Sequence, residues 1–440
     1  MTVNRTDPHQ AEDRAPRLLE PWSHLTIDGL CRLSARPGSA TTAIAEAPDM
    51  VHWYHRTPLT LDRAALQSRA RSFAGKMLAL GLGPGDRVIV QLPNVIDLPV
   101  ALLGLMSAGM VACPVPVTYG FDDLLHAAEV SGAKAMVTVG RYGSLSLADT
   151  ARRVAAAVFS IRFLCGFGAP LPDGVVALDA WPDEDVASDK TPNAGDATDI
   201  ALVTFERRNG SLIALARTHQ QLICDALALS NVAKLKPSSI ILSTLPPATA
   251  LGVVAVLVAP ALSGAGVHLH GPFNSDVLAS QLDELPPAHL LIPAAVERIL
   301  PPLLDATDRK SARPILAHRW PMPPHEFRSM QQAAMSLIDL HAIGECAVLA
   351  AARAEGDALK PIPVRVSHPT PHTLPPATAM LECLLDRESQ LTVRGFSVPT
   401  RLGSEGASGE DWYPTGLLGS VAGPSSISLS PTRAAETEAA

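Results

Sequence analysis

Helix-like and strand-like blocks alternate regularly in the first third of the chain, and this alternation constrains the fold more than any other feature. Residues 66–80 place apolar side chains at helical spacing, and the glycine-rich segment 81–85 ends that block. The short apolar run 88–92 follows, as buried strands do, and the same pair of blocks recurs over residues 98–117 and 121–139. This order predicts an α/β protein with a parallel sheet.

Changes of composition divide the 440 residues into several parts. A segment rich in Pro, Asp and Gly, residues 166–200, reads as a surface connection, and after residue 360 short apolar stretches alternate with Pro and Gly. We therefore expect two stacked α/β subdomains and a small β-rich subdomain. The expected boundaries are a disordered tail at 1–20, α/β subdomains at 21–199 and 200–355, the β-rich subdomain at 356–422 and a disordered tail at 423–440.

Charge and hydropathy argue against two classes of partner. The net charge of -8 gives no positive field for nucleic acid, and no block of Lys and Arg marks a membrane surface. The longest apolar runs fall short of the roughly 18 to 20 residues that span a bilayer, and the first residues lack a signal peptide core. The sequence predicts a cytoplasmic protein without a membrane span. Its six scattered cysteines predict buried thiols and no zinc site.

Residues 59–139 carry a specific set of motifs in a specific order. They include the GL-x-PGDRV turn at 81–88, LPN at 92–94 and AG-x-x-x-x-P-x-P at 108–116. This stretch resembles the opening of acyl-CoA synthetases and of the wider adenylate-forming superfamily. The resemblance implies the large domain of that superfamily, whose β-rich subdomain is a distorted barrel. These residues are scaffold, so they imply fold and not activity.

The resemblance also implies a phosphate-binding loop, which in active members has the sequence TSGTTG-x-PKG followed by a TH pair. The matching segment is residues 205–214, with its register fixed by Thr218 and His219. Only Gly210 survives, Glu206 would place an anion beside a triphosphate, and Ile213 stands at the lysine position. Such a loop is expected to hold ATP poorly.

Arg207 and Arg208 leave an alternative open. Guanidinium groups bind phosphate through paired hydrogen bonds, so the two arginines are candidate replacements for the lost lysine. Their long side chains would also fill the space that glycine keeps open for backbone contact. In the other interpretation the segment is a solvated surface loop.

Two further elements of the family, those that line the adenine pocket and bind Mg²⁺, have changed. The GGAPLP element that lines the adenine pocket corresponds to 318–323, where Trp320 either occupies the room for adenine or serves as a core aromatic. The YGMTE element corresponds to 341–345, with His341 and Gly344 at the Tyr and Thr positions. Glu345 is retained, and it is the one candidate Mg²⁺ ligand.

The ribose and acyl positions have changed as well. In the segment WYPTGLLG at 412–419, Thr415 is retained but Leu417 stands where the family has a ribose-binding Asp, and Leu cannot accept those hydrogen bonds. Thr249 replaces the His of P-L-x-H-x-x-G, near the acyl carboxylate. We consider Thr249, His219 and His341 the candidate substrate-binding residues.

Active members continue into a C-terminal domain of about a hundred residues that supplies a catalytic lysine. This sequence ends at Ala440 and its last lysine is Lys360, so we expect neither the domain nor that lysine.

The leading hypothesis is an acyl-CoA synthetase-like protein that does not use ATP and has no cofactor. It would bind an acyl or aryl acid, an acyl carrier protein or an active ligase homologue. The alternative is an active ATP- and Mg²⁺-dependent ligase that uses Glu345, Arg207 and Arg208 and a C-terminal domain from another chain. A third hypothesis places other chemistry at His219, His318 and His341.

Overall fold

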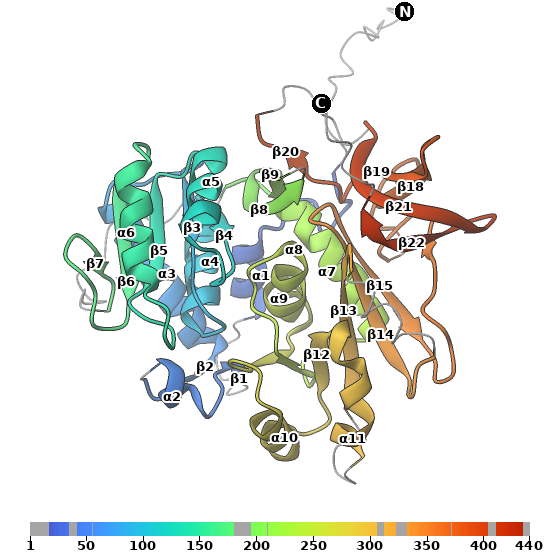
Figure 1. Ribbon diagram of the computed structural model, residues 1–440, viewed down its shortest axis with the longest axis horizontal. Helices are drawn as coiled ribbons and strands as arrows, with labels where there is room; N and C mark the ends of the chain where they lie inside the picture. The colour runs from blue at the N-terminus through green and yellow to red at the C-terminus, as the bar shows by residue number, and fades with distance from the viewer. Residues whose placement is uncertain are drawn as a thin grey trace, which may run out of the picture.

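In the computed structural model the strands of the described residues form three sheets, two of eight strands and one of six, and helices pack on them (Figure 1). The described residues are 17–34, 42–54, 56–179, 195–208, 210–305, 312–322, 332–370, 372–403 and 411–433. Residues 1–16 and 434–440 of the predicted tails, and Pro323 of the adenine segment, lie outside them. The tail predicted at 1–20 is wrong over 17–20, because Leu18 is buried and its backbone N–H donates to Gln220.

The first eight-stranded sheet confirms the α/β prediction. Its order is β20-β9-β8-β4-β3-β5-β6-β7, and β8, β4, β3, β5, β6 and β7 pair in parallel. The strands are β3 (Arg87–Val90), β4 (Val111–Pro114), β5 (Ala135–Val139), β6 (Phe163–Phe167), β7 (Val176–Ala177), β8 (Ile200–Arg208), β9 (Ser211–Thr218) and β20 (Thr400–Arg401). The intervening helices are α3 (Arg63–Ala79), α4 (Asp97–Ser107), α5 (Phe121–Ser131) and α6 (Leu147–Ala157).

The second sheet has the order β15-β14-β13-β12-β10-β11-β1-β2 and is parallel from β14 to β1. Its strands are β1 (Thr42–Ala45), β2 (Thr60–Asp62), β10 (Ile240–Ser243), β11 (Gly266–Leu269), β12 (His289–Pro293), β13 (Arg313–Trp320), β14 (Leu337–Ile343) and β15 (Ala347–Arg353). The remaining helices are α1 (Ile27–Ser34), α2 (Met50–Tyr54), α7 (His219–Ala233), α8 (Ala250–Val253), the π-helical turn η2 (Val254–Val258), α9 (Ala259–Ser263), α10 (Ser275–Glu284), the 3-10 helix η3 (Ala294–Ile299) and α11 (Leu300–Leu304).

The two α/β sheets do not divide at residue 200, where the sequence predicts a subdomain boundary. Strands β8 and β9 follow that boundary in sequence but lie in the first sheet, while β1 and β2 come from the N-terminal part and lie in the second. A parallel strand needs a long crossover, so strands that are neighbours in space need not be neighbours in sequence.

The third sheet is antiparallel, with the order β16-β22-β21-β19-β18-β17. Its strands are β16 (Ile362–Pro363), β17 (Arg365–Val366), β18 (Leu381–Leu385), β19 (Gln390–Arg394), β21 (Tyr413–Gly423) and β22 (Ser426–Arg433). The disordered tail expected from residue 423 is therefore wrong over 423–433. Ile427 and Leu429 alternate with serines and are buried, a two-residue period that the serine-rich composition obscured.

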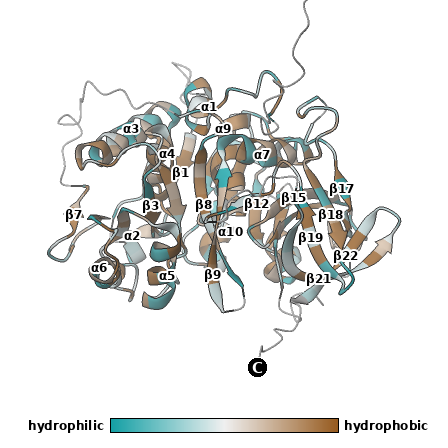
Figure 2. Cartoon of the chain, turned by 90° about the horizontal axis from the view of Figure 1, so that it is seen from above, coloured by the Kyte–Doolittle hydropathy of each residue, from teal (hydrophilic) through white to brown (hydrophobic). Residues whose placement is uncertain are grey.

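Two hydrophobic cores join the units. The first contains α4, α7, η2 and α9, and all 11 residues of α4 are buried. The second joins the β12–β15 side of the second sheet to the third sheet and to one face of β9. In Figure 2, hydrophobic colour follows the strands and the helices packed on them. In the described part of the chain, no helix combines the length and hydropathy needed to cross a membrane.

Candidate functional site

The segment that matches the phosphate loop is a tight hairpin. Strand β8 runs to Arg208 and β9 begins at Ser211, so residues 209–210 alone connect them. Arg207 pairs with Leu212 and Arg208 pairs with Ser211 in an antiparallel register. A phosphate cradle needs several free backbone N–H groups pointing at one point in space. Along a paired strand successive N–H groups point to opposite sides and do not converge, so the expected loop is replaced by sheet.

Arg207 is an exposed residue at the end of this hairpin. Its guanidinium donates hydrogen bonds to the Asp123 carboxylate and, at 3.0 Å, to the carbonyl of Gly210. Its side chain is 52% exposed. The interpretation of this segment as a solvated loop is therefore wrong about the backbone, although it describes the surroundings of Arg207.

Arg208 points toward the second and third sheets instead. It donates to the carbonyl of Pro414, lies 3.1 Å from the Cys346 sulfur, and its guanidinium carbon lies 4.7 Å from the centre of the Tyr413 ring. The side chain is 17% exposed and pairs with Glu206 at 3.2 Å. Arg208 thus acts as an interior link between sheets, and its Nη1 and Nη2 donors are already engaged, while its buried Nε has no hydrogen-bond partner among the described residues.

Glu206 is a buried anion held between β8 and the turn after β14. Its carboxylate accepts hydrogen bonds from the backbone N–H of Glu345 at 3.2 Å and from the Cys346 thiol at 3.6 Å. A Cβ atom added at Gly344 would lie 2.7 Å from each carboxylate oxygen. Gly344 also has a φ of 54°, which favours glycine. The carboxylate of Glu206 therefore occupies the space that a side chain at Gly344 would need.

Three replaced positions meet in one apolar cluster. Ile213 on β9, Trp320 on β13 and Leu417 on β21 belong to the second core and are 9%, 4% and 1% exposed. By resemblance these positions correspond to the phosphate lysine, the adenine wall and the ribose aspartate. They come from three strands far apart in sequence, and the same core contains Ile343 and Met322. The polar groups of a nucleotide would lose their hydrogen bonds in such a cluster.

Trp320 is a core aromatic, as one of the two sequence interpretations had it. Its indole N–H donates to His341 Nδ1 at 3.1 Å, and the two rings stack with centroids 6.3 Å apart. His341 stacks in turn on His318 at 4.8 Å. Burial lowers the pKa of His341 to about 3, so this ring is neutral at pH 7 and its Nδ1 can accept the hydrogen bond from the indole N–H.

The third hypothesis needed His219, His318 and His341 to approach one another. His318 and His341 do, but His318 Nε2 lies 2.7 Å from the Asp339 carboxylate inside a buried network that continues through Arg353 to Glu297. His219 begins α7, where its Nδ1 accepts the backbone N–H of Ile27 at 3.3 Å. Burial lowers the pKa of His219 to about 4. These contacts are structural and expose no reactive nitrogen.

Glu345 is 4% exposed and its oxygens are occupied. Oε2 accepts the backbone N–H of Ala250 at 2.8 Å, and Oε1 lies 3.7 Å from the Arg319 guanidinium. Burial raises the pKa of Glu345, opposed by Arg319 and the Ala250 N–H. Among the described residues, no group of three or more His, Cys, Asp or Glu side chains is placed to hold a metal ion.

Thr249 and Thr415 serve as local hydrogen-bonding groups. Thr249 caps α8 by accepting the backbone N–H of Gly252 at 3.2 Å. Thr415 is 1% exposed and donates to the carbonyl of Leu391 at 2.7 Å. Thr249 is half-buried beside the Ala250–Glu345 contact, so it is the candidate substrate-binding residue with both a polar group and partial access.

Sequence reasoning missed Arg217, which is fully buried on β9. Its Nη2 donates to the carbonyl of Glu345 at 2.7 Å, while Nε and Nη1 have no hydrogen-bond partner in the described structure. The buried carboxylate of Asp225 on α7 likewise has none, and burial raises its pKa to about 7 against the attraction of Arg217. An arginine within an apolar strand, directly before Thr218, was the available signal.

Comparisons with known proteins give a consistent likeness. The family described as AMP-binding enzyme matches residues 41–205. Salicyl-AMP ligase / salicyl-S-ArCP synthetase of Mycobacterium tuberculosis is 28% identical over 244 residues, 56% of this chain and 41% of the relative. A 2-hydroxy-7-methoxy-5-methyl-1-naphthoate–CoA ligase of Streptomyces carzinostaticus is 27% identical over 257 residues, 55% of this chain and 45% of the relative. The matched segments span less than half the length of these relatives.

Solved structures share the fold across almost the whole chain. The apo structure of Mycobacterium smegmatis MbtA has a TM-score of 0.69 at 20% identity and covers 93% of this chain and 76% of that one. A long-chain-fatty-acid-CoA ligase from Archaeoglobus fulgidus has a TM-score of 0.70 at 16% identity and covers 94% and 85%. At these identities the likeness is one of architecture.

Proposed function

Because this chain belongs to the adenylate-forming superfamily, we propose that it is a ligase-like protein that has lost ATP use and acts by binding. Its ligand or partner would be an acyl or aryl carboxylic acid, an acyl carrier protein or an active ligase homologue. One observation carries the proposal: Ile213, Trp320 and Leu417 stand at the positions of three nucleotide-handling groups, and all three are buried in the same hydrophobic core.

The hairpin supports the same proposal independently. A triphosphate gains much of its binding energy from converging backbone N–H groups at a loop and helix N-terminus. In the β8–β9 ladder Arg207 lies opposite Leu212 and Arg208 lies opposite Ser211, so this segment is paired as strands and does not form such a loop. The two arginines are held by Asp123, Glu206 and Pro414, which leaves the arginine-based alternative without a free pair of guanidinium groups.

An acid-binding role has support at the edge of the same region. The Arg319 side chain is 63% exposed, and its long contact of 3.7 Å to Glu345 is a weak ion pair. A ligand carboxylate could compete for this guanidinium, with Thr249 near by. The names of the similar proteins point to salicylate and naphthoate among aryl acids and to long-chain fatty acids among acyl ones.

Pyrophosphate exchange tests the loss of ATP use. The purified chain would be given ATP, Mg²⁺ and radiolabelled pyrophosphate with salicylate, 1-naphthoate and palmitate in turn. We expect exchange no greater than that of a heat-denatured sample. Exchange that depends on one of the acids would overturn the proposal and favour the active ligase. A chain that exchanges nothing yet binds salicylate with an affinity that falls in Arg319→Ala would support an acid-binding role.

A further inference from the structure

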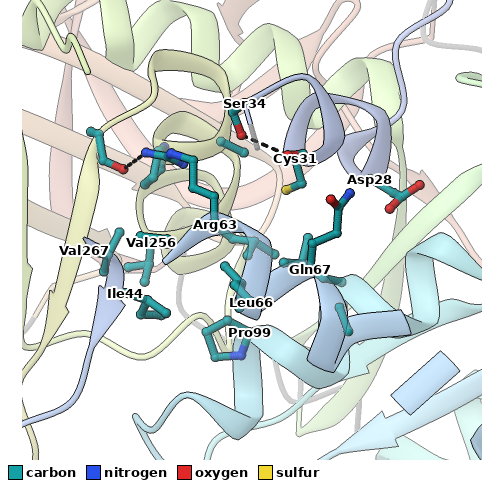
Figure 3. A pocket seen from close by; sticks show the side chains of 17 residues that line it. Asp28, Cys31, Ser34, Ile44, Arg63, Leu66, Gln67, Pro99, Val256 and Val267 are labelled. Atoms are coloured by element: carbon teal, nitrogen blue, oxygen red, sulfur yellow. Dashed lines mark hydrogen bonds between the residues drawn. The ribbon is translucent and has the colours of Figure 1, made fainter. Parts of the chain in front are cut away.

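A pocket lies between elements of the two α/β units, away from the residues of the β8–β9 hairpin. It is enclosed by α1, α3 and α4 on one side and by β1, β11, η2 and α9 on the other (Figure 3). Its empty volume, including the part open to solvent, is about 560 Å³. None of the residues that match the nucleotide-binding elements lines it, so it is separate from the region described above.

Most of the pocket wall is aliphatic. Leu66, Leu103, Val256, Leu257 and Val267 supply side chains from both α/β units. Apolar pockets of this kind bind small ligands because the ligand removes hydrocarbon surface from water at little polar cost. The space that a water-sized sphere can reach inside it is only about 40 Å³, so a ligand can be no larger than about one ring and the wall must yield to admit it.

One end of the pocket is polar, and its groups are incompletely paired. Gln67 on α3 extends toward Asp28 on α1, as Figure 3 shows, but its side-chain nitrogen has no hydrogen-bond partner in the described part of the chain. Asp28 is 5% exposed and bonds Arg32 through Oδ2. The nearby Arg63 is engaged by the carbonyls of Gly264 and Ala265. A donor on α3 and an acceptor on α1 therefore face each other across a gap.

We propose that this pocket binds a small neutral molecule that has an apolar ring or chain and a hydroxyl group at one end. The hydroxyl would donate its proton to the Asp28 carboxylate and accept a hydrogen bond from the Gln67 amide, while the apolar body contacts Leu66 and Leu103. A single hydroxyl can do both because it is one donor with two acceptor lone pairs.

The surrounding charges select against ionised ligands. A ligand carboxylate would meet the Asp28 carboxylate, and Arg63 already has carbonyl partners. A ligand ammonium would lie near both Arg63 and Arg32 and would lose its hydration against an aliphatic wall. A neutral hydroxyl avoids both costs.

Two probes of matched shape test the proposal: p-cresol carries a hydroxyl where p-xylene carries a methyl group. Binding to the full chain would be measured by saturation-transfer NMR and by competition. We expect p-cresol to bind at least tenfold more tightly than p-xylene, because a site built to bond a hydroxyl rejects the analogue that lacks it. Equal affinities, or no p-cresol binding up to its solubility limit, would overturn the proposal, the latter leaving the gap to water.

A substitution locates the binding. Gln67→Leu should weaken p-cresol about tenfold and leave p-xylene unchanged or tighter, since it removes the amide donor and adds apolar surface. Gln67 is half-buried on a helix surface, so the variant should fold. Gln332→Leu, at an exposed site outside the pocket, is the matched control and should bind p-cresol as the wild type does. A p-cresol affinity that is equal in Gln67→Leu and Gln332→Leu would contradict the assignment.

Discussion

Two regions of this molecule share the fold of the superfamily but differ in how far they keep its sequence motifs. Residues 59–139 keep the motifs of the superfamily, and their helices and strands follow its order. Around Glu206 the fold is also kept, but at positions that match nucleotide-binding elements the side chains bond within the protein: Glu206 with the Glu345 N–H, Arg208 with Pro414, Trp320 with His341. The second region is not a damaged site. It is a repacked interior, and restoring single family residues should therefore harm it.

Leu417→Asp should have the largest effect, because it puts a carboxylate into the apolar cluster at a position that is 1% exposed. We expect a loss of unfolding free energy of about 4 kcal/mol or more, since the charge has no partner. Urea denaturation followed by circular dichroism would measure it. Leu384→Asp is the control, because that strand residue is 50% exposed and should lose less than about 1 kcal/mol. Equal losses would contradict the repacked interior.

The buried carboxyl of Asp225 should make stability depend on pH. Its pKa is raised to about 7 when folded, mainly by burial, so the folded state holds a proton that the unfolded state releases near pH 4. This contribution is complete at low pH and is lost as pH rises toward about 7. Relative to wild type, Asp225→Asn should gain up to about 4 kcal/mol of unfolding free energy between pH 4 and pH 8.

The comparison of Asp225→Asn with wild type cancels the other titrating groups, and the exposed Asp149→Asn variant serves as the control. Parallel stability curves for wild type and Asp225→Asn would show that folding does not shift the pKa of the Asp225 carboxyl and would refute this prediction.

Gly344→Thr restores the threonine of the family, and we expect it to lower the unfolding free energy by about 3 kcal/mol. Part of the loss comes from the φ of 54° and part from contact with the Glu206 carboxylate. Gly356→Thr measures the backbone contribution alone, since Gly356 has a φ of 81° with no atom within 4 Å of an added Cβ. The double variant Glu206→Ser, Gly344→Thr should recover part of the difference. If Gly344→Thr lowers the unfolding free energy no more than Gly356→Thr does, contact with the Glu206 carboxylate does not contribute and the proposed steric coupling is wrong.

Arg208→Ala should lower the unfolding free energy by about 2 kcal/mol, because it leaves Glu206 buried without its ion pair and removes the contact with Tyr413. Arg207→Ala should change it by less than about 1 kcal/mol, since the Arg207 side chain is half exposed. Thermal unfolding of both variants would rank them. The opposite ranking would mean that the interior link described for Arg208 is unimportant.

The scaffold was predictable because its signals are local. Helical spacing, glycine-rich turns and apolar runs fixed the βαβα order, and Thr218 with His219 fixed the register of the hairpin. The hairpin also had a local signal, because Asn209-Gly210 is a sequence typical of two-residue turns. The match of residues 205–214 to the phosphate-binding segment favoured a loop instead.

The repacked interior was not predictable, because its pairs are distant in sequence. Glu206 and Gly344 each look like a loss when taken alone, and only the structure shows that one side chain fills the space left by the other. Arg217 and Asp225 are similar: a buried arginine has no periodic signature, and its relation to α7 depends on how β9 turns into the helix. Alternation in β22 was weak because serine occupies the outward positions.

Titration of the chain with ATP and Mg²⁺ by calorimetry tests the central claim most directly. If Ile213, Trp320 and Leu417 close the nucleotide position, no binding heat should appear up to millimolar ATP, and ATP should leave the melting temperature unchanged. A dissociation constant in the micromolar range would contradict the account, because it would require the β8–β9 hairpin and the apolar cluster to open for a nucleotide.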